Sequence, residues 1–295
     1  MLRPTPLSDD EVAQIFNRCG CCYTAGSNFL KELSADPELR LTKPIFSVMV
    51  LLIRHQIEAL DAATVLTKAG RPQFVSSISR SMYETYLNVL GVGFLRSTVG
   101  QVSYSPPYNA RRFVAFRNVA VNKYDRKVEL LSDAWARLGL DPDVARKNRR
   151  LLMRRTAAAK KMYGFNDKTV SWFHHNGVGG LFQQLWKDNS APCFPQPLFP
   201  LARGRQEWLE WFGMYWGHGS NQVHASIVGL TSRPDDARGK WPSSDPVFEY
   251  SSLDSALSLA DLSLYSAADA LGKLAAFNRV SAATKLDASA LRRYL

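Results

Sequence analysis

The chain has 295 residues, of which 46% are hydrophobic, so it is long enough to bury a sizeable core. Its formal net charge of +11 favours an anionic partner such as nucleic acid or a membrane surface. No apolar stretch reaches the roughly 20 residues that span a bilayer, and the acidic start lacks the apolar core of a secretory signal. We therefore expect a cytoplasmic protein that does not enter a membrane.

Apolar residues recur with helical periodicity along most of the chain, and few segments alternate in the manner of a half-buried strand. This pattern predicts an all-α fold, a helical bundle of antiparallel helices with additional peripheral helices. No internal repeat or second-domain boundary is apparent. We expect a single domain over residues 1–295, with a core from 44–99 and 203–278 and a basic, aromatic middle segment at 110–202.

The first helix is expected from Ser8, whose hydroxyl caps it, to about residue 34, and the second from Pro44 to about residue 69. A tight Gly-Arg-Pro connection at 70–72 then leads into a third helix, so the second and third helices should form an antiparallel hairpin. A loop at 99–109 follows. The later helices are expected at 110–138, from Pro142 through a basic run, at 205–231 and at 252–278, with a short one in the tail.

Residues 208–230 place four polar side chains in an otherwise apolar helical segment: His218, Ser220, Asn221 and His224. An unpaired buried polar group costs roughly 1–3 kcal/mol, so these side chains need partners. The third helix offers Arg80 and Glu84, which stand one turn apart, and the second helix offers Asp61. The sequence therefore predicts a polar seam between these helices.

The seam has the residue types for proton transfer on a phosphate-bearing substrate. Ser220 and His224 share one helix face, and an imidazole with a pKa near ~6.5 exchanges protons at neutral pH. The planar guanidinium of Arg80 suits a phosphate, with Glu84 and Ser220 orienting the pair. The alternative is structural, with His224 closing a core junction and Arg80–Glu84 forming an internal ion pair.

Metal chemistry is a third alternative, carried by Glu58, Asp61, Glu84 and His224. His218 and His224 are six residues apart, which is not a same-face helical spacing, and no Glu-x-x-His occurs in these segments. The Cys-Gly-Cys-Cys run at 19–22 lacks the paired spacing of zinc sites, so its cysteines are expected to be ordinary buried thiols. We expect no metal and no cofactor.

The helix after Pro142 contains the most one-sided charge run of the chain, with no acid between residues 146 and 161. Such a run is either a solvated face or a contact for a phosphate backbone. Trp172, His174 and His175 lie just beyond it and would add stacking on unpaired bases. The candidate nucleic-acid-binding residues are Arg149, Arg150, Arg154, Arg155, Lys160 and Lys161.

Two blocks of the sequence resemble the bacterial all-helical DUF5677 family: HQIEALDAATVLTKAGRPQFVSSISRSMYETYLNV and YWGHGSNQVHASIVGL. The positions that carry the resemblance are Asp61, Arg80, Ser81, Glu84, Tyr215, Ser220 and His224. That family is distantly similar to HEPN domains, many of which are metal-independent ribonucleases of toxin and phage-defence systems and use an Arg-x4-6-His motif. No arginine stands four to six residues before His224, so Arg80 or His218 would have to replace it.

The resemblance implies a HEPN-like core, a homodimer, and an RNA-binding or RNA-cleaving effector of bacterial toxin or antiviral defence systems. In that hypothesis His224 is the general base or acid, Arg80 binds the phosphate, and Ser220, Glu84 and Asp61 complete the site. RNA or another phosphate-bearing ligand is the expected partner. The competing hypothesis is a non-catalytic helical scaffold whose Arg-Glu-Ser-His seam only fixes helix register.

Overall fold

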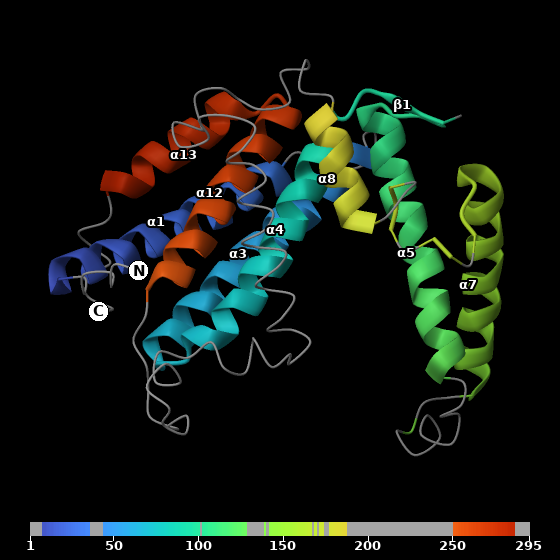
Figure 1. Cartoon of the computed structure of the whole chain (residues 1–295), viewed down its shortest axis with the longest axis horizontal. Coiled ribbons are helices and arrows are strands. Elements are labelled where there is room, and N and C mark those ends of the chain that lie inside the picture. The colour runs from blue at the N-terminus through green and yellow to red at the C-terminus, as the bar shows by residue number, and fades with distance from the viewer. Residues whose placement is uncertain are drawn as a thin grey trace. The chain divides into compact units, whose positions relative to one another are not determined.

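The computed structural model describes residues 8–35, 44–100, 102–128, 139, 142–166, 168–169, 171–173, 177–187 and 250–286. These residues form eight helices and a single two-stranded sheet, which confirms the predicted all-α class (Figure 1). The contacts divide the chain into two compact units. Unit 1 contains residues 1–90 and 191–295, and unit 2 contains residues 91–190. The expected joining of 203–249 to the hairpin core lies outside the described residues and stays a prediction.

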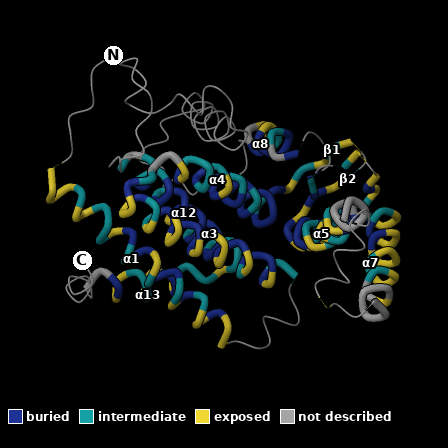
Figure 2. The backbone as a smooth tube through the Cα atoms, turned by 90° about the horizontal axis from the view of Figure 1, so that it is seen from below, coloured by how far each residue is buried: buried dark blue, intermediate teal, exposed yellow. Residues whose placement is uncertain are grey.

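Unit 1 is a bundle of α1 (Asp9–Ser34), α3 (Pro44–Lys68), α12 (Ser251–Ala270), α13 (Leu274–Leu286) and most of α4 (Pro72–Phe94). Helix α1 packs against α3, α12 and α13, and α12 also packs against α3. The buried faces of these helices point inward to a common core (Figure 2). The fully buried side chains of that core include Phe29, Phe46, Met49, Ile53, Leu60, Met82 and Leu87.

Helix α1 begins as the sequence predicts, because Ser8 and Glu11 form a reciprocal capping box. The Ser8 hydroxyl accepts from the Glu11 backbone N–H, and the Glu11 carboxylate accepts from the Ser8 backbone N–H at 2.8 Å. Farther along α1, Gly26 allows close helix packing. A Cβ at this position would lie 2.6 Å from Ile57 Cδ1, so glycine permits α1 to approach α3.

A buried glutamine joins three helices of unit 1. Gln56 of α3 is fully buried and its Nε2 donates to the Met82 carbonyl of α4 at 2.8 Å and to the Ser263 hydroxyl of α12 at 2.6 Å. The Ser263 hydroxyl donates in turn to the Leu259 carbonyl. The α3–α4 hairpin therefore does bring polar groups of the two helices together.

The single helix expected over 252–278 is wrong, because the chain forms two helices there. Gly272 adopts a left-handed conformation with φ +66° and ends α12. Its backbone N–H donates to the Asp269 carbonyl, and the Lys273 N–H donates to the Ala268 carbonyl. Glycine has no Cβ to oppose this conformation, so it commonly terminates helices in this way.

Unit 2 contains a short hairpin and three helices: β1 (Thr98–Val99), β2 (Val102–Ser103), α5 (Pro106–Val128), α7 (Pro142–Tyr163) and α8 (Gly177–Lys187). The two strands pair antiparallel, Thr98 with Ser103 and Val99 with Val102. The expected start of α5 at residue 110 is wrong by about one turn. Pro106 and Pro107 fit within that first turn because its N–H groups have no intrahelical partners.

Helix α7 packs along α5, with Thr156 donating to the Asn118 carbonyl at 3.0 Å. A small cluster of Val119, Ala159 and Phe165 fills the space between them. At the other end of α5, the buried Asn109 side chain donates to the carbonyls of Gly91 and Leu95, both at 2.9 Å. Within the described residues, no helix has the length and apolar character required to cross a membrane.

Candidate functional site

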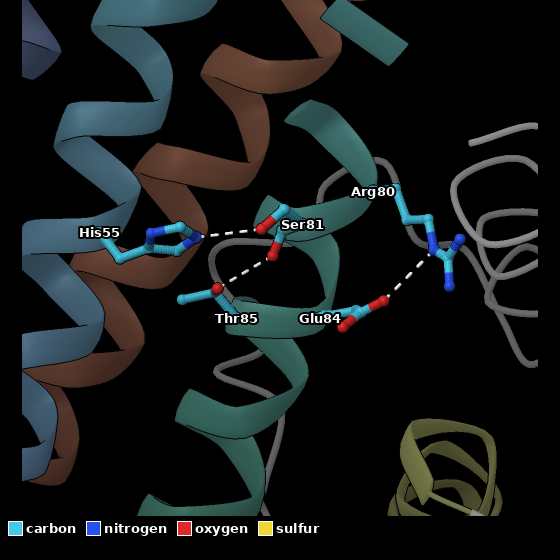
Figure 3. Close-up of polar contacts among 5 residues, drawn as sticks. All are labelled: His55, Arg80, Ser81, Glu84 and Thr85. Carbon is cyan, nitrogen blue, oxygen red and sulfur yellow. Dashed lines mark hydrogen bonds and ion pairs between the residues drawn. The ribbon is translucent and has the colours of Figure 1, made fainter. Parts of the chain in front are cut away.

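Arg80 and Glu84 form the ion pair that their spacing predicts. Arg80 Nε donates to Glu84 Oε1 at 3.2 Å, one turn apart on α4 (Figure 3). The Arg80 side chain is 14% exposed and the Glu84 side chain 34% exposed, so the pair is partly shielded from water. The guanidinium and the carboxylate therefore interact more strongly than a fully solvated pair of the same spacing.

Burial raises the pKa of Glu84 above its ordinary value, although the nearby Arg80 guanidinium lowers it in part. Desolvation disfavours the charged carboxylate, and here this effect exceeds the attraction of the arginine. A carboxyl group with a raised pKa beside a cation is able to hold and release a proton nearer to neutral pH. Among the described residues of the predicted seam, Glu84 is therefore the group best suited to acid–base chemistry.

Ser81 lies on a different side of α4 from this pair. It hydrogen-bonds His55 of α3, with 3.1 Å between His55 Nε2 and Ser81 Oγ, and Figure 3 shows Arg80 and Glu84 directed away from that contact. Asp61 is exposed on α3, and no hydrogen bond or ion pair joins it to Arg80 or Glu84 within the described residues. The structure thus brings together Arg80 and Glu84 and leaves Asp61 apart from them.

The other half of the predicted seam, Ser220 and His224, lies outside the described residues. Its juxtaposition with Arg80 and Glu84 stays a prediction. No group of three or more His, Cys, Asp or Glu that would hold a metal ion occurs in the part of the chain that the structure describes. The thiols of Cys19 and Cys22 are buried in α1, as expected.

The basic helix is α7, and most of its candidate residues are accessible. Arg150, Arg154, Arg155 and Lys161 are exposed, whereas Arg149 and Lys160 are half-buried. Only one face of α7, which includes Thr156 and Ala159, is buried. Figure 2 shows exposed residues along much of the helix. A polyanion would therefore meet several cations of this helix at once.

The expectation that Trp172 stacks on bases is wrong, because its side chain is only 3% exposed. Its ring packs against Tyr104 and Phe113, and its carbonyl accepts a 2.6 Å hydrogen bond from Arg112 Nε. Arg112 is itself fully buried, and its guanidinium lies 4.4 Å from the centre of the Phe165 ring. His174 and His175 lie outside the described residues.

Division of the chain into units shows how unevenly its charge is distributed. Unit 2 holds 18 Lys and Arg against seven Asp and Glu, which is a net charge of +11 in 100 residues. The remaining 195 residues hold 19 of each and are neutral overall. All of the net positive charge of the protein therefore resides in unit 2.

The prediction from the charge run omitted two cations of α5. Arg111 and Arg117 are exposed on this helix, which packs against α7. They stand among apolar and polar residues instead of in a run, so local patterning did not reveal them. A charge count over the whole segment 91–190 would have included them.

Comparison of the chain with known proteins found no matching family model, curated protein or solved structure.

Proposed function

We propose that this protein binds RNA through unit 2. The observation that carries the proposal is the concentration of the whole net charge in that unit, with exposed cations along α7. Lysine and arginine side chains that neutralise phosphates release counterions, and this release supplies most sequence-independent affinity for nucleic acid. RNA is chosen over other polyanions because of the resemblance to DUF5677 and HEPN-like proteins.

A labelled hairpin RNA with a paired stem and an unpaired loop tests the binding. Fluorescence anisotropy of the full chain with this RNA should give saturable binding at about 50 mM salt, weakening steeply at about 200 mM. Absence of binding at the lower salt concentration would overturn the proposal. Because the hairpin offers both paired and unpaired nucleotides, this result does not depend on which form is preferred.

Cleavage of the bound RNA is the second candidate function, favoured by the raised pKa of Glu84 beside Arg80. In this reaction an RNA 2′-hydroxyl attacks its own phosphorus and the 5′-oxygen leaves, which yields a 2′,3′-cyclic phosphate and a 5′-hydroxyl. His224 would move the proton and Arg80 would hold the phosphate, as in a toxin or phage-defence effector. Metal is not required, so EDTA should leave the rate unchanged.

The scaffold hypothesis gives the opposite result in the same assay. His224→Ala should abolish cleavage without loss of RNA binding if the seam is catalytic. If the seam is structural, the purified protein leaves the hairpin intact and His224→Ala lowers only the melting temperature. Sedimentation of the full chain, with and without RNA, tests the homodimer that the resemblance implies.

A further inference from the structure

The exposed cations of α7 form a continuous stripe along the helix. Arg150, Arg154 and Lys161 are four and seven residues apart, so they share one face. At 1.5 Å per residue, this stripe extends about 16 Å along the helix axis. Lys147 and Arg155 are exposed beside it. The cations thus form a fixed row on a regular element, not a cluster on a loop.

Helix α5 extends this cationic surface. Burial and Tyr108 raise the pKa of Tyr163, the last residue of α7, whereas the Arg111 and Arg112 guanidinium groups lower it. Arg111 of α5 is therefore within electrostatic reach of the C-terminal end of α7. Since Arg111 and Arg117 are both exposed, the cations of the two helices belong to one binding surface.

This surface offers no aromatic platform for bases within the described residues. The large apolar side chains exposed in unit 2 are Val114, Val121, Leu151, Met153 and Met162, none of which is aromatic. The aromatic rings pack against one another instead, as in the pairs of Tyr104 with Phe173 and of Tyr163 with Phe165. Binding of single strands commonly depends on stacking worth about 1–3 kcal/mol per base, which this surface does not supply.

The two helices are held rigidly at the end where α7 meets Arg111. Arg112 of α5 donates to the carbonyls of Tyr163 and Trp172, so it fixes the end of α7 and the following segment on α5. Thr156 adds a second link between the helices. A rigid row of cations matches a polyanion whose phosphates are already ordered, because neither partner then loses much conformational freedom.

We infer that the exposed surface of α5 and α7 binds the phosphate backbone of double-stranded RNA and does not read its base sequence. This inference rests on the proposed RNA binding and specifies its substrate class. A double helix presents regularly spaced phosphates outward and keeps its bases stacked inside, which complements a rigid cationic face without stacking groups. Exposed Leu151, Met153 and Met162 among the cations also suit an anionic membrane, so vesicles are included in the test.

The test compares a 20-base-pair RNA duplex with an unstructured 20-nucleotide poly-uridine strand by anisotropy, using the full chain. The duplex should bind at least about tenfold more tightly, because the strand gains no stacking. A second duplex of unrelated sequence should bind within about twofold of the first, since phosphates carry no sequence information. Tighter binding of the single strand, or a strong dependence on duplex sequence, would overturn the inference.

Paired variants locate the contact. Arg150→Gln with Arg154→Gln should weaken duplex binding and reduce the slope of log affinity against log salt by about 1.8, or about 0.9 for each lost phosphate contact. The matched control is Arg18→Gln with Arg279→Gln, which removes the same charge from two exposed arginines of unit 1. Equal losses in the two double variants would show that net charge, not this surface, determines binding, and would overturn the inference.

The remaining probes separate this inference from the proposed function. If the duplex fails but the hairpin RNA still binds through its loop, only the inference falls. If phosphatidylglycerol vesicles bind and neither RNA form does, both fall. Tighter binding of a DNA duplex of the same sequence would overturn the choice of RNA.

Discussion

Glu84 is the described residue whose protonation is most sensitive to the fold. Its spacing from Arg80 predicts the ion pair from sequence alone, because residues four apart on a helix are neighbours. Its raised pKa was not predictable, since desolvation depends on which other segments cover the side chain. The same limit applies to Trp172, whose position after a basic run suggested stacking but whose burial depends on contacts with α5.

Glu84 should make stability depend on pH in a defined direction. Because its folded pKa lies above its unfolded value, its contribution to stability is full at low pH and is lost as pH rises from about 4.3 through the raised value. The free energy of unfolding of the native protein should therefore fall relative to that of Glu84→Gln between pH 4 and pH 7. Urea denaturation of both proteins measures the difference.

Glu58→Gln is the matched control, because Glu58 pairs with Arg54 at the same spacing on α3 but is 60% exposed. Desolvation is small at an exposed site, so this variant should differ from the native protein by a nearly constant amount over the same pH range. An unchanging difference for Glu84→Gln as well would contradict the pKa shift.

The thiols of α1 should react slowly with alkylating reagents. Burial raises the pKa of Cys19 to about 11 and raises that of Cys22 as well. The thiolate is the reactive form, so at pH 8 iodoacetamide should modify both residues at least about tenfold more slowly in native than in unfolded protein. Mass spectrometry of peptides quantifies each site. Rapid native labelling of Cys19 would show that this part of α1 opens readily.

At the scale of elements, punctuation residues decided how well the helices were predicted. Gly70 ends the second helix where expected, and the antiparallel hairpin of α3 and α4 follows from the short connection. Gly272 interrupts an otherwise continuous helical pattern, and the surrounding alanines and leucines masked its effect. The proline pair at 106–107 had the reverse effect, since a residue that breaks helix interiors is tolerated in a first turn.

Gly26 tests the packing of α1 on α3. In Gly26→Ala the new methyl group would clash with Ile57, and overpacking costs about 1–3 kcal/mol. The higher helix propensity of alanine offsets about 1 kcal/mol of that cost. We expect a net destabilisation of up to about 2 kcal/mol in chemical denaturation.

Ile57→Val removes the Cδ1 atom that lies nearest to the new methyl group. The double variant Gly26→Ala with Ile57→Val should therefore be more stable than the sum of the two single changes predicts. Strict additivity would mean that α1 shifts away from α3 and that Ile57 does not limit their approach.

At the scale of the whole molecule, the net charge was visible in the sequence but its location was not. The run at 146–161 contributes only part of the charge of unit 2, and the boundary of that unit follows from contacts between residues distant in sequence. Close cations repel one another, which destabilises a compact unit. Unit 2 therefore bears an electrostatic cost that unit 1, with balanced charge, does not.

Salt should consequently stabilise the protein. Raising ionic strength from about 0.01 M to about 0.15 M shortens the Debye length from about 30 Å to about 8 Å and screens this repulsion. We expect the melting temperature to rise by about 2–4 °C, which corresponds to about 1 kcal/mol for a chain of this size. Calorimetry measures the shift, and a fall with salt would show that attractive ion pairs outweigh the repulsion.

The buried Arg112 has a consequence for behaviour in acid. Its described contacts are two backbone carbonyls, a tyrosine hydroxyl and aromatic rings, none of which gains a proton as pH falls toward 3. The pairs Arg18–Asp254 and Arg279–Glu32, which link α1 to α12 and α13, each lose their attraction when the carboxylate is neutralised. Acid therefore removes links within the bundle of unit 1, while the attachment of α7 to α5 is retained. The cationic surface should outlast the bundle as an acid-resistant part of the protein.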